Sequence, residues 1–194
     1  GVPQLNCLAG IVPQGVSREA AQATLVANLA FAAGKLEAEG LRLLIEPINT
    51  FDMPGFFLSR TRQAIDIIDE TRAGNLFVQY DVYHMQRMEG ELAHTIESNL
   101  ARIRHLQIAD NPGRHEPGTG EINYPFLFRH LDQLGYEGWI GCVYRPATST
   151  AAARAHAIER WHLPHYMKDV EVIFEESGGS VNVRVREGRS PILD

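Results

Sequence analysis

Short apolar runs alternate along the chain with longer stretches in which apolar residues recur every three or four positions. The runs have the length of strands and predict five of them, at residues 5–9, 41–45, 76–80, 103–108 and 139–144. The longer stretches predict helices at residues 18–39, 61–71, 91–100, 124–134 and 150–161. Ser17 fits the N-cap of the first helix, and helix ends are expected at Gly40, Gly74 and Gly135. Regular alternation of strand and helix is typical of a parallel α/β sheet.

The predicted strands are apolar at nearly every position rather than at every second one. This pattern is typical of strands that are buried on both faces, as in barrels and doubly wound sheets. Both cysteines, Cys7 and Cys142, lie in such runs and outside any C-x-x-C pair. We therefore expect buried free thiols of a reducing compartment rather than catalytic groups.

The pattern changes in the last part of the chain. Residues 170–174 and 181–185 alternate apolar and polar side chains on either side of a Gly-Gly turn, which predicts a β-hairpin. An antiparallel hairpin is foreign to a series of strand-helix units. The sequence therefore predicts two parts, a parallel α/β domain at residues 1–165 and an appended hairpin tail at residues 166–194.

Oxygen-bearing side chains recur where the predicted strands end. Glu46 and Asp81 directly follow two of them, and Gln107 lies near the end of the next. In a parallel barrel these ends share one mouth, where three oxygen ligands would suit Mg²⁺ or Mn²⁺. Each residue alone would more simply begin a solvated loop, but three in register favour a site. His84 and His105 lie close by in sequence, although a lone histidine is more often packed or solvated than a ligand.

A loop rich in glycine and proline, at residues 113–121, follows the strand that carries Gln107. Arg114 in this loop is suited to bind a substrate carboxylate through paired hydrogen bonds. A phosphate cradle is an alternative, although the lysine of a P-loop is absent. An ordinary turn with a solvated arginine fits the same residues equally well.

Composition narrows the classes of function. The 194 residues are 44% hydrophobic and 22% charged, which is typical of a globular domain. A net charge of -6 argues against a nucleic-acid partner, because such proteins concentrate Lys and Arg. No apolar run approaches the roughly 18 residues that span a bilayer, and no leader pattern opens the chain. We expect a cytoplasmic protein with no membrane partner and a small substrate.

Three sequence runs resemble the hydroxypyruvate isomerase family of xylose-isomerase-like barrels. They are L-L-I-E-P-I-N at 43–49, Q-Y-D-V-Y-H-M-Q-R-M-E-G-E-L at 79–92, and H-L-Q-I-A-D-N-P-G-R-H-E-P-G-T-G-E-I-N-Y at 105–124. The resemblance covers about residues 1–150. It implies a partial TIM barrel whose units correspond to the fourth to eighth of eight, with the hairpin appended.

The resemblance also implies roles for individual residues. Glu46 corresponds to a catalytic carboxylate that also binds the metal, and Asp81 and Gln107 correspond to further metal ligands. His84 and Arg114 correspond to residues that contact the substrate. The family reaction interconverts hydroxypyruvate and tartronate semialdehyde by metal-assisted proton transfer through an enediolate.

One position departs from the family pattern. The family strand G-C-E-Y-K-P carries a second catalytic carboxylate, which is also the fourth metal ligand. Residues 141–146 read G-C-V-Y-R-P, and Val143 can neither bind a cation nor move a proton. We therefore expect impaired activity and a weakened or lost metal.

Other interpretations stay open at this point. The chain would be a non-catalytic scaffold or chimera if the barrel fragment is retained only for its fold. A sugar epimerase with a sugar-like substrate, or an apurinic-site endonuclease, would have the same barrel fold. Open edges at residues 5–9 and 139–144 invite pairing, so the tail is expected to cover one of them or to mediate a homo-oligomer.

Overall fold

The computed structural model describes residues 2–149, 170–177 and 180–187. The chain forms two compact units, residues 1–105 and 106–194. The helix expected at 150–161 and the boundary expected near residue 165 lie outside the described residues, so both stay predictions.

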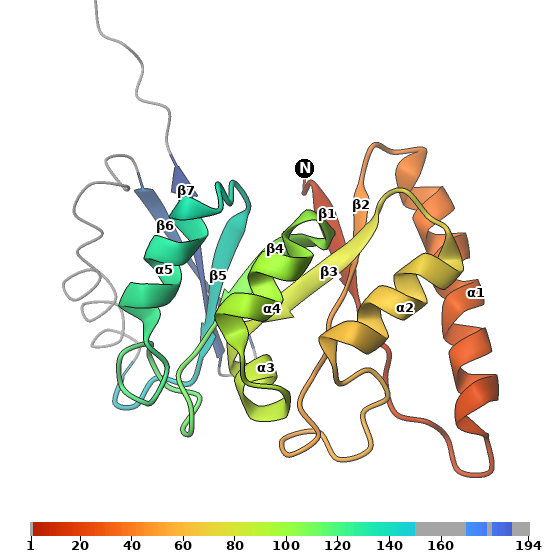
Figure 1. Ribbon diagram of the computed structural model, residues 1–194, viewed down its shortest axis with the longest axis horizontal. Coiled ribbons are helices and arrows are strands. Elements are labelled where there is room, and N and C mark those ends of the chain that lie inside the picture. The colour runs from red at the N-terminus through yellow and green to blue at the C-terminus, as the bar shows by residue number, and fades with distance from the viewer. Residues whose placement is uncertain (1, 150–169, 178–179, 188–194) are drawn as a thin grey trace, which may run out of the picture. The chain divides into compact units, whose positions relative to one another are not determined.

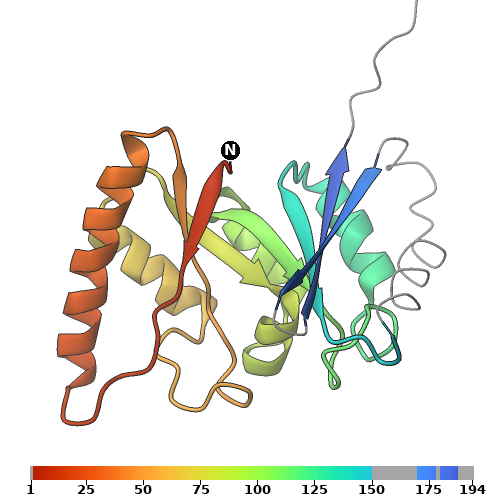
Figure 2. The ribbon, with the colours of Figure 1, turned by 180° about the vertical axis from the view of Figure 1, so that it is seen from behind.

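The first unit is built on parallel strands. β1 (Gln4–Cys7) pairs with β2 (Arg42–Ile45), and β2 pairs with β3 (Leu76–Asp81). Helices α1 (Arg18–Glu37) and α2 (Thr61–Thr71) follow β1 and β2 and lie on one face of this sheet (Figure 1). Figure 2 shows the same ribbon from behind. The parallel α/β class expected from the sequence is therefore confirmed.

The core of the first unit lies between the strands and these two helices. β2 and β3 are buried along almost their whole length, as their apolar composition predicts. The same prediction is wrong for β1, where Leu5 is 45% exposed and Cys7 is only half-buried. The buried side chains facing these strands from the helices include Leu29, Ala33, Ala64, Ile65, Ile67 and Ile68.

Helix ends follow local backbone chemistry. The Ser17 hydroxyl accepts a hydrogen bond from the Ala20 amide at 3.1 Å, which confirms the expected N-cap. Gly40 and Gly135 adopt left-handed φ angles of 69° and 68° just after their helices, as expected of glycines at helix ends. The end expected at Gly74 is wrong, because Arg72 already takes the left-handed conformation at φ 57°.

The segment after β3 contains a helix that the hydrophobic pattern missed. α3 (Val82–Met88) begins directly after β3, and α4 (Leu92–Asn99) with the short 3-10 helix η1 (Leu100–Arg102) replaces the single helix expected at 91–100. The first four residues of α3 are buried, so the helix starts inside the core, directly after β3, with no exposed turn between the two elements.

The second unit has its own strands and helix. β4 (Ile103–Ile108) begins in the first unit and ends in the second, where α5 (Tyr124–Gln133) and β5 (Trp139–Tyr144) follow. The Asn123 side chain caps α5 by accepting from the Phe126 amide. β7 (Ser180–Glu187) pairs antiparallel with β5 and with β6 (Val170–Ser177). That this tail is an appended element stays a prediction.

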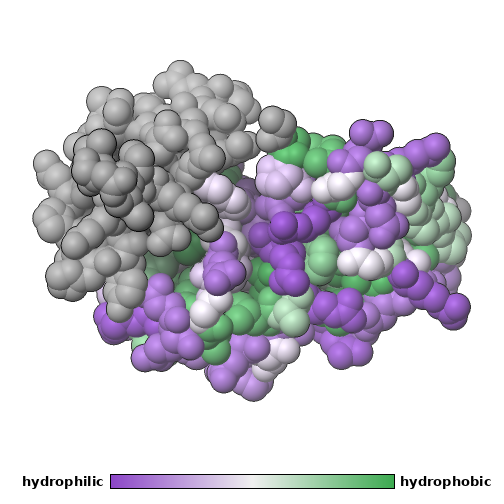
Figure 3. Space-filling model, turned by 90° about the horizontal axis from the view of Figure 1, so that it is seen from above, coloured by the Kyte–Doolittle hydropathy of each residue, from purple (hydrophilic) through white to green (hydrophobic). Residues whose placement is uncertain are grey.

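The described surface carries both hydrophilic and hydrophobic residues. On the face drawn in Figure 3, hydrophilic and hydrophobic residues are interspersed. In the described part of the chain, no helix has the length and apolar character needed to cross a membrane.

We predict that removing residues 167–194 makes the protein aggregate or changes its oligomeric mass. The deletion takes away β7 and leaves the backbone groups of one edge of β5 unpaired. Size-exclusion chromatography with light scattering measures the mass, and removal of residues 188–194 alone is the control because it keeps both strands. A soluble deletion variant of unchanged mass would contradict the role given to β7.

We predict that thiol alkylation distinguishes the two cysteines. Burial raises the pKa of Cys142 to about 12, so its reactive thiolate is scarce at neutral pH. Cys7 is half-buried on β1 and should be modified first by iodoacetamide, as followed by peptide mass spectrometry. Equal rates at both positions would show that Cys142 is accessible in the folded protein.

Candidate functional site

Three side chains from the first unit meet where β2 and β3 end. Glu46 directly follows β2, Asp81 is the last residue of β3, and His84 lies in the first turn of α3. Because β2 and β3 are parallel, with Ile45 opposite Val78, their carboxyl ends lie at the same edge of the sheet. The expectation that Glu46 and Asp81 share one rim is therefore met within this unit.

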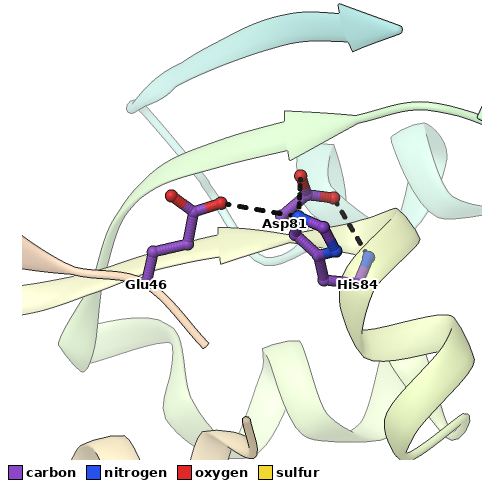
Figure 4. A group of neighbouring side chains, drawn as sticks. All are labelled: Glu46, Asp81 and His84. Atoms are coloured by element: carbon purple, nitrogen blue, oxygen red, sulfur yellow. Dashed lines mark hydrogen bonds and ion pairs between the residues drawn. The ribbon is translucent and has the colours of Figure 1, made fainter. Parts of the chain in front are cut away.

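The three side chains point toward one another (Figure 4). His84 Nε2 lies 3.6 Å from Asp81 Oδ2 and 3.9 Å from Glu46 Oε1. One ligand atom from each residue lies within 4.8 Å of the other two. The exposed fractions are 6% for Glu46, 0% for Asp81 and 2% for His84, so the group is almost completely removed from solvent.

Two amides hold the Glu46 carboxylate in place. Oε2 accepts hydrogen bonds from Asn6 Nδ2 of β1 and from Gln79 Nε2 of β3, both at 2.7 Å. Because these donors are neutral, they orient the carboxylate without neutralising it, and Oε1 remains on the side of His84. The sequence analysis missed Asn6 and Gln79. The available signal was alternation, which places Gln79 on the same face of β3 as Asp81.

Asp81 is held by the start of α3. Its Oδ1 accepts hydrogen bonds from the amides of Tyr83 at 2.8 Å and His84 at 3.2 Å, which makes Asp81 the N-cap of this helix. One carboxylate oxygen is thereby used for the fold, and Oδ2 faces the imidazole of His84.

This arrangement fits a divalent cation. Two buried carboxylates this close repel each other when both are ionised, and a cation between them would remove that repulsion. Carboxylate oxygens are ligands that Mg²⁺ and Mn²⁺ prefer, and imidazole is suited to several transition metals. Glu46, Asp81 and His84 are the residues of the first unit that could hold it.

A second set of polar residues lies behind His84. Asn49 is fully buried, and its Nδ2 lies 2.6 Å from His84 Nδ1. The loop residue Asp52 contacts Asn49 through two hydrogen bonds, accepts one from the Tyr83 hydroxyl at 2.8 Å, and forms an ion pair with Arg87. None of these residues was singled out by the sequence patterns, because their function depends on contacts between separate segments.

The charge of Asp52 is stabilised in this network. Burial alone would raise the pKa of Asp52. Hydrogen bonds from Asn49 and Tyr83, with the charge of Arg87, outweigh burial and lower that pKa below its ordinary value. Asp52 is therefore an anion at neutral pH.

Gln107, Arg114 and Val143 belong to the second unit. Gln107 is half-buried on β4, and Val143 is half-buried on β5. His105, the last residue of the first unit, is half-buried on β4 as well. Arg114 adopts a left-handed φ of 55°, and its carbonyl accepts from the Arg145 amide at 2.7 Å. The loop that carries Arg114 is thus tied to the segment after β5.

Buried carboxylates organise that loop. Asp110 accepts from the amides of Gly118 at 2.6 Å and Ile122 at 3.1 Å, and Glu116 accepts from the Ala147 amide at 3.2 Å. These acceptors give the Gly- and Pro-rich segment a defined conformation, beyond that of a solvated turn. Neither carboxylate was predicted as structural from the sequence.

Comparison with known proteins agrees with this architecture. A family model described as xylose isomerase-like TIM barrel matches residues 1–161. The chain belongs to this family. Its resemblance to hydroxypyruvate isomerases is also confirmed, since it is 53% identical over 165 residues to the hydroxypyruvate isomerase of Escherichia coli, covering 85% of this chain and 62% of that protein.

Other members of the family are also similar. The 2-oxo-tetronate isomerase of Cupriavidus necator is 49% identical over 152 residues, covering 78% of this chain and 58% of that protein. A crystal structure described as AP endonuclease, family 2, from Brucella melitensis is 39% identical with a TM-score of 0.77, covering 84% of this chain and 61% of that one. The chain thus spans 58–62% of the length of these relatives.

We predict that Asp81→Asn abolishes stabilisation by Mn²⁺. A ligand at 100 times its Kd stabilises a folded protein by about 2.7 kcal/mol, which thermal unfolding detects as a raised Tm. Asparagine caps helices about as well as aspartate, so the variant should lose the charge at the site while keeping α3.

The matched control is Asp66→Asn. It removes the same charge from an exposed ion pair with Arg62 on α2, and exposed ion pairs contribute little to the free energy of unfolding. A Tm that rises equally with Mn²⁺ in the Asp81→Asn variant would place the cation elsewhere.

Proposed function

We propose that this chain carries the isomerase chemistry of its relatives, in which a carbonyl and a hydroxyl exchange between adjacent carbons of a small hydroxy-keto acid. The supporting observation is the buried group of Glu46, Asp81 and His84 at the carboxyl ends of neighbouring parallel strands. Catalytic groups of such barrels gather at this end of the strands. By resemblance, the units of this chain correspond to the fourth to eighth of the barrel.

Glu46 is the base in this proposal. Its carboxylate takes the proton from the carbon that bears the hydroxyl, and the substrate becomes an enediolate. A proton is then delivered to the former carbonyl carbon, while the hydroxyl proton moves to the former carbonyl oxygen. The amides of Asn6 and Gln79 bind Oε2 and leave Oε1 oriented toward the centre of the site for this exchange.

The cation site in this proposal consists of Glu46, Asp81 and Gln107. A bound Mg²⁺ or Mn²⁺ would stabilise the negative charge of the enediolate. Asp81 supplies Oδ2, because Oδ1 is already used to cap α3. Gln107 adds a neutral oxygen from β4.

The proposed substrate is a 2-oxo acid. Hydroxypyruvate and 2-oxo-tetronate, after which two relatives are named, both carry a carboxylate next to a ketone. Arg114 binds that carboxylate in this proposal, and His84 contacts an oxygen of the reacting carbons. We also propose a reducing, cytoplasmic location, on the ground that Cys7 and Cys142 are free thiols.

A non-catalytic scaffold is the second candidate, and Val143 is the observation that favours it. By the resemblance to hydroxypyruvate isomerases, this position corresponds to a glutamate that would act as the second carboxylate. With valine there, the return path of the proton and one metal ligand are lost, and we expect activity far below that of the relatives. An endonuclease is disfavoured by the net charge of -6, since DNA phosphates are neutralised by Lys and Arg.

We predict that Val143→Glu raises the rate of hydroxypyruvate isomerisation by about 10²- to 10⁴-fold, which is the usual contribution of one acid-base group. The matched control is Val143→Gln, which has the same shape without the charge. Glu46→Gln in the Val143→Glu background should remove the gain. The rate is measured by coupling tartronate semialdehyde to its reduction by NADH, with Mg²⁺ or Mn²⁺ present.

Three outcomes contradict the proposal. Equal gains from the Glu and Gln variants would show that the charge at residue 143 is irrelevant. Retention of the gain in the Glu46→Gln variant would exclude Glu46 as the base. No activity in any variant, with either 2-oxo acid, would favour the scaffold.

A further inference from the structure

The hydrogen bonds behind His84 determine which of its ring nitrogens carries the proton. In a neutral imidazole one nitrogen is a donor and the other an acceptor. Nδ1 lies 2.6 Å from Asn49 Nδ2, and Nε2 faces Glu46 and Asp81. The tautomer therefore depends on whether Asn49 presents its NH₂ group or its oxygen to the ring.

Asp52 fixes the orientation of the Asn49 amide. The Asp52 backbone amide donates to Asn49 Oδ1 at 2.8 Å, and Asn49 Nδ2 donates to Asp52 Oδ2 at 3.1 Å. Reversing the amide would set its oxygen against the Asp52 carboxylate and its NH₂ against the Asp52 N–H. Both contacts would then be repulsive, so the NH₂ group must face His84 Nδ1.

The Asp52 side chain is itself held in place by neighbouring residues. The Tyr83 hydroxyl donates to Asp52 at 2.8 Å, and Arg87 forms an ion pair with the same carboxylate. The Arg87 guanidinium also lies 4.9 Å from the centroid of the Phe51 ring. Asp52 thus remains an anion in a fixed position, and it cannot turn to accept a reversed amide.

We propose that Asn49 and Asp52 are positioning residues that keep His84 protonated on Nε2, so that His84 offers a hydrogen-bond donor, and not a metal ligand, to the centre between Glu46 and Asp81. The Asn49 NH₂ group leaves Nδ1 only the role of acceptor. A doubly protonated ring would set two donors against each other at 2.6 Å. A metal ligand needs a lone pair, which the protonated Nε2 does not have.

This assignment changes how the site works. The cation would be bound by carboxylate oxygens alone in the first unit, while His84 donates to an oxygen that becomes negative in the enediolate. A donor placed where charge develops contributes more in the transition state than in the ground state. This consequence rests on the proposed function, whereas the tautomer rests only on the geometry around Asn49.

The test is nitrogen NMR of protein labelled with ¹⁵N-histidine, at a pH well above the ordinary pKa of histidine. His84 is identified by the signals that disappear in His84→Gln. We expect a pyridine-like Nδ1 and a pyrrole-like Nε2, unchanged when Mg²⁺ is added. A pyrrole-like Nδ1, or loss of the Nε2 proton on addition of Mg²⁺, would overturn the proposal. This measurement needs no variant of Asn49 and no activity.

Asn49→Asp tests the proposal by replacing the donor that faces His84 Nδ1 with an acceptor. A carboxylate can only accept, so His84 Nδ1 should become protonated in this variant. Asn123→Asp is the matched control, because it makes the same charge change at the N-cap of α5, where aspartate caps equally well. An unchanged His84 signal in folded Asn49→Asp protein would overturn the proposal.

Kinetics separate this proposal from the proposed function. In the Val143→Glu background, Asn49→Asp should lower kcat by about 10²- to 10³-fold, the usual cost of losing a transition-state donor, with a smaller change in KM. Absence of isomerase activity with the expected tautomer would refute the isomerase alone. Full activity in Asn49→Asp with a reversed tautomer would refute the role given to the His84 donor.

Discussion

Parallel pairing of β2 with β3 is the constraint on which the site depends. It places the residue after Ile45 beside the end of β3, so that the carboxylates of Glu46 and Asp81 are brought together and buried. Burying two like charges is costly unless other groups compensate. Burial of Ala64, Ile65, Ile67 and Ile68 of α2 and of the strands beneath them supplies the hydrophobic stabilisation that holds the carboxylates together.

In each carboxylate of the site, one oxygen accepts hydrogen bonds from the surrounding structure and the other is directed to the centre of the site. Asp81 uses one oxygen to begin α3 and presents the other to the centre, and Glu46 uses one oxygen to accept from Asn6 and Gln79. Residues with structural partners are held in one rotamer, which is the preorganisation that proton transfer and metal binding require. His84 is oriented in the same way, because its Nδ1 lies beside Asn49. Each of the three side chains therefore has one polar atom held by a neighbouring residue and a second polar atom directed to the centre of the site.

Family membership and the proposed activity rest on different observations. The membership rests on a match along residues 1–161. β5 carries no carboxylate side chain, and the role given to residue 143 belongs to the proposed function. At the site of the first unit, Glu46 accepts hydrogen bonds from Asn6 and Gln79, and His84 lies within hydrogen-bond distance of Asn49.

The sequence by itself determined the parallel α/β class, the helix starts and stops at Ser17, Gly40 and Gly135, and the identity of Glu46 and Asp81 as candidates. These follow from local rules, namely hydrophobic period, capping chemistry and position at the end of a strand. His84 became a candidate only through the family resemblance. Only the tertiary structure decided that β1 is partly exposed, that α3 begins directly after Asp81, and that Asn49 and Asp52 lie behind His84. These depend on contacts between segments distant in sequence, where a loop after β2 meets a helix after β3, and no local pattern carries that information.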